Sequence, residues 1–274
     1  MQTHIPEIAH QRLWERVKWY FITGGLPEVV ATFCANRTNL FGAFEEVRAK
    51  QEQILIAYFA DIAKHAGKVN AMHIHRVLES VPAQMARSQD GTANKFKFRD
   101  VVPGIDRYQR LANAIDWLTT AGLIIKIPVV NYGQAPLKAY TKEGQFKLLL
   151  FDVGILGAMI RLSVHSILSY DYGTYKGYFA ENYVAQELIA SLQQPIYSWQ
   201  KNRNQIEFLC ELQGEVIPIE VKSGSVVQSN SLQKYIDKYH PSYSVIMSAN
   251  NLSVAFLQAR HCYSLYLANR FPLY

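Results

Sequence analysis

The chain has 274 residues, of which 49% are hydrophobic, and its formal net charge at pH 7 is +6. This length and composition predict about two globular domains, and the modest positive charge is compatible with nucleic acid but falls short of a strong basic tail. No apolar run reaches the roughly 20 residues of a bilayer span, which argues against a membrane protein. The three cysteines are widely spaced and odd in number, so they indicate a reducing compartment, which we expect to be the cytoplasm.

Residues 1–69 form the first predicted domain, which is mainly helical. Apolar residues recur at three-to-four spacing over 7–22 and over 41–65, as in amphipathic helices. Between them, Gly24-Gly25-Leu26-Pro27 predicts a turn, because glycine reaches backbone angles that other residues avoid. This segment is not a phosphate-binding loop, since the chain has no Gly-x-x-x-x-Gly-Lys-Ser/Thr motif, and we expect no ATPase activity from it.

Residues 70–145 form the second predicted domain, which resembles a winged helix. The pattern predicts helices at 72–85 and 108–121, followed by a small hairpin of strands at 123–130 and 135–140. Such a module often places a helix in the major groove of DNA, but it is also a common protein-docking unit.

A short basic segment in this domain is a candidate DNA footprint. Its first three cations alternate with Phe96 and Phe98, so an extended chain would bury the rings and expose the charges. The cations could contact phosphates, or they could guard a solvated strand edge against aggregation, and we favour the second interpretation because acidic residues interleave the run. The five candidates are Lys95, Lys97, Arg99, Arg107 and Arg110.

Residues 146–274 form the third predicted domain, in which helices and strands alternate. Helical periodicity covers 178–192 and includes Glu181, whose carboxylate also suits the start of a helix dipole. A strand at 196–199 follows, then a hairpin of strands at 205–212 and 215–222 around Gln213-Gly214. A helix at 231–239 and an apolar strand at 243–247 complete the pattern.

The hairpin register places two acids face to face. Symmetric pairing sets Glu207 opposite Glu220 and Gln205 opposite Lys222 on one face. The other face is predicted to be apolar, with the pairs Ile206–Val221, Phe208–Ile219 and Cys210–Ile217. Like charges directly opposite on a sheet are destabilising, so the repulsion needs an offset. A divalent cation, Lys222, a shared proton or plain exposure to water on an ordinary surface hairpin could each provide it.

Two carboxylates beside a lysine suit metal-dependent phosphodiester cleavage. Mg²⁺ binds one or two carboxylates together with waters and phosphate oxygens, and it lowers the pKa of bound water. A nearby lysine can orient the water or neutralise developing negative charge.

The order of these elements resembles the PD-(D/E)xK restriction-endonuclease-like fold. Glu181 on the helix, Glu207 on the strand and the Glu220-Val-Lys222 segment match the positions of its acids and lysine. The resemblance implies that Glu207 and Glu220 hold Mg²⁺ or Mn²⁺, that Glu181 is an accessory ligand, and that Lys222 assists the water. This sequence departs from the common pattern in having Glu, and not Asp, at position 207.

Five further segments, in order along the chain, resemble the C-terminal part of a bacterial and archaeal family of AAA-type ATPases. That part includes the domain-of-unknown-function family numbered 4143, which a nucleotide-binding domain normally precedes. The resemblance implies an ATPase partner, and this chain would be a fragment, a shortened relative or a sequence whose start codon is placed late. The segments are 20–30, 110–124, 146–156, 177–188 and 217–224.

The sequence therefore predicts an α+β protein in which a helical and winged-helix region precedes a restriction-endonuclease-like α/β domain. The expected function is DNA binding with metal-dependent phosphodiester cleavage through Glu207, Glu220 and Lys222, assisted by Glu181. The alternative is an inactive nuclease-fold module that serves interaction or regulation, associated with an AAA-type ATPase, since a fold alone does not imply a function.

Overall fold

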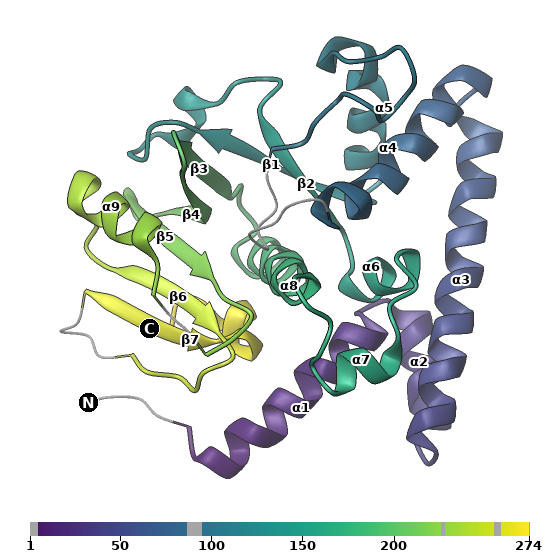
Figure 1. The fold of residues 1–274 in the computed structure, drawn as a ribbon, viewed down its shortest axis with the longest axis horizontal. Helices are drawn as coiled ribbons and strands as arrows, with labels where there is room; N and C mark the ends of the chain where they lie inside the picture. The colour runs from purple at the N-terminus through teal and green to yellow at the C-terminus, as the bar shows by residue number, and fades with distance from the viewer. Residues whose placement is uncertain (1–4, 87–94, 226–227, 255–258, 274) are drawn as a thin grey trace.

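The chain is a mixed α+β protein with a helical N-terminal region and a mixed sheet toward the C-terminus (Figure 1). The computed structural model describes residues 5–86, 95–225, 228–254 and 259–273. Its α-helices are α1 (Glu7–Thr23), α2 (Pro27–Asn36), α3 (Leu40–His65), α4 (Lys68–Ala86), α5 (Tyr108–Thr120), α6 (Val153–Met159), α7 (Val164–Leu168), α8 (Tyr175–Leu192) and α9 (Asn230–Tyr239). Two 3₁₀ helices are η1 (Leu137–Tyr140) and η2 (Leu265–Arg270). The strands are β1 (Ile124–Val130), β2 (Phe146–Leu150), β3 (Tyr197–Lys201), β4 (Asn204–Leu212), β5 (Glu215–Val221), β6 (Ser244–Ser248) and β7 (Arg260–Ser264).

The first three helices follow from local sequence signals. Gly24 ends α1 with φ of 66°, a conformation that glycine adopts without strain, and Pro27 begins α2 at a position where its missing N–H costs nothing. The Asn39 side chain then caps α3 by accepting a hydrogen bond from the Gly42 amide at 3.3 Å. The turn predicted at Gly24-Gly25 is thus confirmed, as are the helices predicted on either side of it.

One sheet of seven strands organises the rest of the described chain. Its order is β2-β1-β3-β4-β5-β6-β7. The hairpin strands β4 and β5 are antiparallel, whereas β5, β6 and β7 run parallel to one another. β1 joins the sheet by pairing in parallel with β3 and antiparallel with β2. All five residues of β2 and of β6 are buried, which explains their almost continuous apolar sequences.

The prediction of a second wing strand at 135–140 is wrong. Strand β1 forms as expected, but it pairs with β2, and the segment predicted as its partner contains the 3₁₀ helix η1. Pro136 has no backbone N–H to donate to a ladder, and the next amide, of Leu137, donates to Glu211 Oε2 at 3.0 Å. The winged-helix assignment and the division into three domains stay predictions, although strands from both sides of residue 145 share one sheet.

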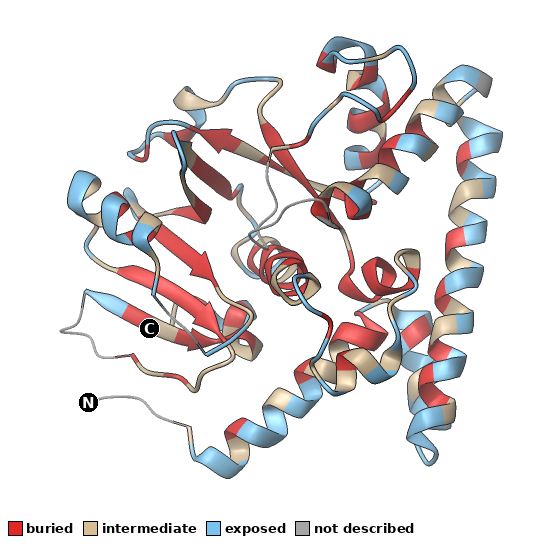
Figure 2. Cartoon of the chain, in the orientation of Figure 1, coloured by how far each residue is buried: buried red, intermediate tan, exposed pale blue. Residues whose placement is uncertain are grey.

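The two faces of the sheet are covered by different helices. The core on the α8 face contains Phe208, Cys210 and Ile219 together with apolar residues of α8. On the other face, Leu232 and Tyr235 of α9 pack against Ile246 and Trp199. Figure 2 shows that the central strands are buried almost throughout, whereas buried and exposed residues alternate along α3. Acidic side chains on the middle strands are therefore removed from water.

Candidate functional site

The three acids predicted for the site are all buried, on three different elements. Glu181 of α8 is 1% exposed, Glu207 of β4 is 2% exposed and Glu220 of β5 is 3% exposed. Burying an ionised carboxylate is unfavourable unless a cation or a proton compensates it. Exposure to water, the ordinary explanation for two opposed acids on a hairpin, therefore does not apply here.

The hairpin register is as predicted over most of its length. Gln213 and Gly214 both have positive φ, as a two-residue hairpin turn requires, and the ladder runs from Leu212–Glu215 to Phe208–Ile219. One step further, the Val221 amide donates to Glu207 Oε2 at 3.3 Å. The Glu207 carboxylate thus reaches across to the strand that carries Glu220.

The prediction of which sheet face each side chain occupies is wrong for Ile206. The pairing between β3 and β4 shifts by one residue between the pairs Trp199–Ile206 and Tyr197–Leu209. Such a bulge rotates one part of a strand relative to the other. Ile206 consequently packs with Trp199 and Leu209 on the α9 face, and not with Phe208 on the α8 face. Its predicted pair with Val221 lies outside the observed ladder, as does the predicted pair of Gln205 with Lys222.

Two lysines neutralise the buried acids. Lys147 Nζ lies 2.8 Å from Glu181 Oε1, and the side chains of this pair are each 2% exposed. Lys222 Nζ lies 2.7 Å from Glu220 Oε1, with the lysine side chain 28% exposed. Lys222 therefore contacts the predicted acid, whereas Lys147 was not among the predicted site residues. The signal for Lys147 was a lysine inside the otherwise apolar run 146–150.

The Glu207 carboxyl group has a raised pKa. Burial raises its pKa well above the ordinary value, the Glu220 carboxylate raises it further, and the Lys147 ammonium opposes the rise. Glu220 Oε2 is buried and has no hydrogen-bond partner in the described part of the chain, so a protonated Glu207 can donate to it. Lys147 and Lys222 place two amines beside the three carboxyl groups, and a proton on Glu207 would balance the remaining charge. Two lysines and one shared proton would together offset the repulsion between Glu207 and Glu220.

Among the described residues, the acidic cluster holds no group of three metal-ligating side chains. Across the described ranges, no three His, Cys, Asp or Glu side chains converge on a point that could hold a metal ion. Glu181 and Glu220 are instead engaged by ammonium groups, which compete with a cation for the same oxygens. The assignment of Glu207, Glu220 and Glu181 as ligands of Mg²⁺ or Mn²⁺ stays a prediction.

The helix-dipole explanation of Glu181 is wrong. Helix α8 begins at Tyr175, so Glu181 lies in its second turn, where the dipole has little effect, and the first turn holds no acid. The buried ion pair with Lys147 is the interaction that accounts for an acid at this position.

The predicted DNA footprint is a dispersed set of side chains. Lys95 is half-buried and donates to Gln145 Oε1 at 3.0 Å, while the other four cations are exposed. Gln84 of α4 exchanges two hydrogen bonds, both of 2.8 Å, with the backbone of Lys97. The rings alternate with the charges as expected, since Phe96 is buried, Phe98 packs against the same core and Lys97 is exposed.

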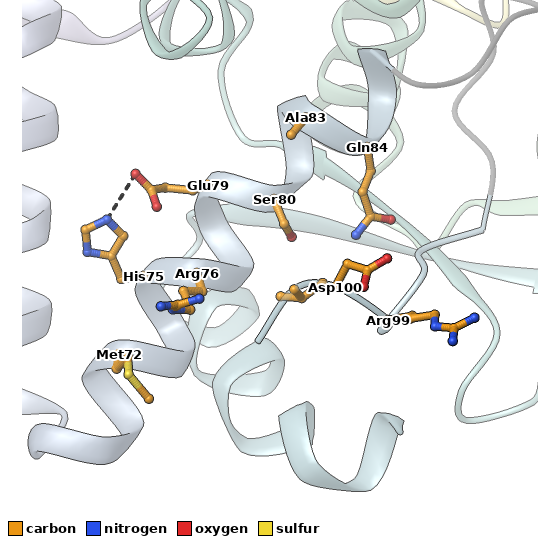
Figure 3. A pocket seen from close by; sticks show the side chains of 10 residues that line it. Met72, His75, Arg76, Glu79, Ser80, Ala83, Gln84, Arg99 and Asp100 are labelled. Carbon is orange, nitrogen blue, oxygen red and sulfur yellow. Dashed lines mark ion pairs between the residues drawn. The ribbon is translucent and has the colours of Figure 1, made fainter. Parts of the chain in front are cut away.

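A cavity of about 470 Å³ lies between α4 and the turn after this segment (Figure 3). Arg99 is the member of the footprint that lines it, together with Arg76. The acids Glu79 and Asp100 line the same walls, so the cavity has charges of both signs. Figure 3 shows Glu79 directed toward His75, with which it forms an ion pair at 3.1 Å. Because its lining carries charges of both signs, the cavity has no electrostatic preference for an anionic ligand.

A second polar cluster joins two segments that the resemblance singled out. Asp152 caps α6 by accepting from the Ile155 amide at 2.9 Å, and it also accepts from the Gly25 amide at 2.7 Å. A Cβ atom on Gly24 would lie 2.1 Å from Asp152 Oδ1, which excludes any larger residue there. Segments 20–30 and 146–156 therefore meet at a buried carboxylate, which is a structural reason for both patterns.

Two family matches divide the chain. Residues 15–166 match the family described as Domain of unknown function (DUF8612), and residues 176–266 match Domain of unknown function (DUF4143). The first match covers more than half of the sequence. The chain belongs to the DUF8612 family. The resemblance to family 4143 is also confirmed, over the part that carries Glu181, Glu207 and Glu220. Lys147 comes from the DUF8612 part, so the cluster spans both.

Searches of curated proteins and of solved structures found no match. Among the described helices of this DUF8612 member, none is long and apolar enough to cross a membrane.

Proposed function

We propose that this chain is a binding module on a nuclease-like fold, in which the acidic cluster holds the domain together and does not cleave phosphodiester bonds. The observation that carries the proposal is the buried pair of Lys147 and Glu181 at 2.8 Å. Lys147 lies among the acids and opposes the rise in the Glu207 pKa.

A lysine cannot replace the catalytic role of a metal ion. Metal-assisted hydrolysis needs an ion that binds and acidifies a water while it contacts the substrate phosphate. An ammonium group has three donors and no site at which a water or a phosphate oxygen could be coordinated. The cluster therefore offers neutralisation of charge without activation of a nucleophile.

The partner that we propose is an AAA-type ATPase. The support is the DUF4143 match, because this domain is commonly found C-terminal to AAA ATPases. In that setting an inert nuclease-like domain would serve recognition or regulation, while ATP hydrolysis would take place in the nucleotide-binding domain.

A second candidate is metal-dependent phosphodiester cleavage. It is favoured by Glu220 Oε2, which is buried without a hydrogen-bond partner among the described residues, and by the raised pKa of Glu207. Glu207 and Glu220 would hold a divalent cation, which would satisfy the buried Oε2 atom and, by its positive charge, oppose the rise in the Glu207 pKa. Lys222 would then lie beside the attacking water.

A cleavage assay separates the two candidates. Labelled single-stranded and duplex DNA would be incubated with the full chain in Mg²⁺ or Mn²⁺, with the variant Glu220→Gln purified in the same way as the background control. The proposal predicts that the wild type cleaves no faster than the variant. Metal-dependent cleavage by the wild type that the variant lacks would contradict it and support the nuclease.

A further inference from the structure

A row of tyrosines and lysines lies on a surface that takes no part in the carboxylate cluster. Tyr132 follows β1, Tyr140 ends η1 and Tyr239 ends α9. The ring centroids of Tyr140 and Tyr132 are 4.7 Å apart, and those of Tyr132 and Tyr239 are 5.6 Å apart. Figure 1 shows α9 and β3 near each other on the side of the molecule away from α3. Tyr132 and Tyr140, which are close in sequence, and Tyr239 of the distant α9 thus build one aromatic surface, which we call the tyrosine row.

Buried residues on the core side of the tyrosine row hold its rings in place. Tyr239 contacts Trp199 and Tyr235, with centroids 6.0 Å and 4.8 Å away. The Tyr235 hydroxyl donates to the Gly133 carbonyl at 2.6 Å, which fixes the loop that carries Tyr132. Rings fixed in this way lose little conformational freedom when a ligand stacks on them.

Tyr132 is exposed at the centre of the tyrosine row, and Tyr140 and Tyr239 are partly buried on either side of it. Tyr132 is 37% exposed, and the other exposed large hydrophobic side chains of the described chain all lie on α1 to α4. An exposed aromatic surface of this kind suits a ligand with flat rings of its own.

Lysines surround the tyrosine row. Lys238 Nζ lies 2.8 Å from the Tyr239 hydroxyl, and 5.9 Å from the centre of the Tyr132 ring. The neighbouring Lys238 side chain lowers the pKa of Lys201. Lys234 lies one turn earlier on α9 and donates to Asn204 Oδ1. The acid of this helix, Asp237, accepts from Gln233.

These three lysines have no ion-pair partner in the described part of the chain. Two adjacent ammonium groups without a carboxylate repel each other, and an anion between them would relieve the repulsion. The predicted footprint differs, because Arg107 there lies beside Asp106 and the neighbouring cavity contains acids.

We propose that the tyrosine row with Lys201, Lys234 and Lys238 binds single-stranded nucleic acid, with bases stacked on the rings and phosphates on the lysines. Proteins that bind single strands without sequence preference combine these two elements, a track of cations and rings on which bases stack. A duplex would keep its bases stacked inside and could not use the rings. An acidic protein segment would use the lysines but not the tyrosines. The inference goes beyond the proposed function and holds whether or not the acidic cluster cleaves.

The test measures binding of the full chain to fluorescein-labelled oligo-dT by anisotropy over a series of salt concentrations, without divalent cations. Tyr132→Ala is expected to weaken binding about 5- to 150-fold, the loss of one stacked base. The double variant Lys201→Gln, Lys238→Gln should reduce the slope of log K against log salt by about 1.4, because each single-strand phosphate contact contributes about 0.7. The matched control, Arg12→Gln with Lys64→Gln, removes two exposed cations from α1 and α3 and should leave binding unchanged.

Unlabelled oligo-dT, duplex DNA and polyglutamate would then compete with the probe. The proposal predicts that oligo-dT competes at the lowest concentration. No binding by the wild type at low salt, an equal loss in the control variant, or stronger competition by duplex or polyglutamate would each overturn it. None of these outcomes depends on cleavage, so a failure here is distinct from a failure of the proposed function.

Discussion

Lys147 is the residue on which the interpretation of the acidic cluster depends. Its substitution by Met keeps the length of the side chain and removes the charge, so Glu181 stays buried without its cation. Breaking a buried ion pair in this way costs about 3–5 kcal/mol in the free energy of unfolding. Urea denaturation measures the loss.

The control for this variant is Lys50→Met, which breaks the more exposed pair with Glu28 at 2.9 Å. Pairs of this kind contribute about 0–1 kcal/mol, so the control should unfold almost as the wild type does. The double variant Lys147→Met, Glu181→Leu should recover part of the loss, since it removes both charges. Equal effects of Lys147→Met and Lys50→Met would show that the buried pair is unimportant.

Glu207 should make stability depend on pH. Its pKa in the folded state is raised well above the ordinary value of 4.5, because of burial and then the neighbouring Glu220. The folded state therefore binds the proton more tightly than the unfolded state. The stabilising contribution is present in full below pH 4.5 and is lost as the pH rises through the raised value.

The variant Glu207→Gln carries a neutral side chain of the same shape at every pH. Relative to the wild type it should gain stability as the pH rises above about 5, measured as the free energy of unfolding at a series of pH values. The exposed Glu46, substituted in the same way, is the control. Parallel curves for the wild type and Glu207→Gln would mean that Glu207 does not retain a proton.

For single residues, the sequence was informative about which residues pair along the hairpin, but not about which side chains from other elements surround them. The turn at Gln213-Gly214 and the hairpin register as far as Phe208–Ile219 were predicted, whereas the predicted pair of Glu207 with Glu220 lies beyond the observed ladder. Lys147 was missed because its contact with Glu181 depends on how β2 packs against α8, which no local pattern encodes. The face of Ile206 was missed because a bulge is set by pairing with β3.

At the scale of elements, the junction of the α1–α2 turn with α6 should be intolerant of substitution. Gly24→Ala would strain a residue with φ of 66° and place its Cβ 2.1 Å from Asp152 Oδ1, so the hydrogen bond from Gly25 would also be disturbed. The strain costs about 1–2 kcal/mol, and loss of a hydrogen bond to a charged group adds about 1.5–3 kcal/mol.

Gly67→Ala is the matched control, because Gly67 has φ of 72° and no atom within 4 Å of its Cβ position. It should show the strain alone, about 1–2 kcal/mol in thermal or urea unfolding. If the two variants were equally destabilised, the contact between the turn and Asp152 would contribute nothing.

The positions of the helices and strands were largely predictable from the sequence, whereas the pairing between strands was not. Helices α1, α3, α8 and α9 and the hairpin appear where periodicity and turn residues indicate. The strand predicted at 135–140 failed, because the proline at 136 and the bond from Leu137 to Glu211 direct that segment elsewhere. Pairing of β1 with β2 and β3 joins segments that no short motif connects.

For the whole molecule, the sheet and the acidic cluster unite the two family matches. β1 and β2 from the DUF8612 part extend the sheet of the DUF4143 part, and Lys147 crosses between them to Glu181. The resemblance to family 4143 could be recognised from the sequence, whereas a self-neutralised cluster could not, because neutralisation depends on both parts at once. The same cluster would be a metal site if its charges were differently arranged.

Thermal melting of the full chain in EDTA and in millimolar Mn²⁺ tests the central claim most directly. A cation bound by the folded state stabilises it by about 2.7 kcal/mol when its concentration is about 100 times the dissociation constant. Because Lys147, Lys222 and a proton already neutralise the acids, we predict the same melting temperature in both solutions. A rise in Mn²⁺ that Glu220→Gln abolishes would contradict this account and show that the cluster is a metal site.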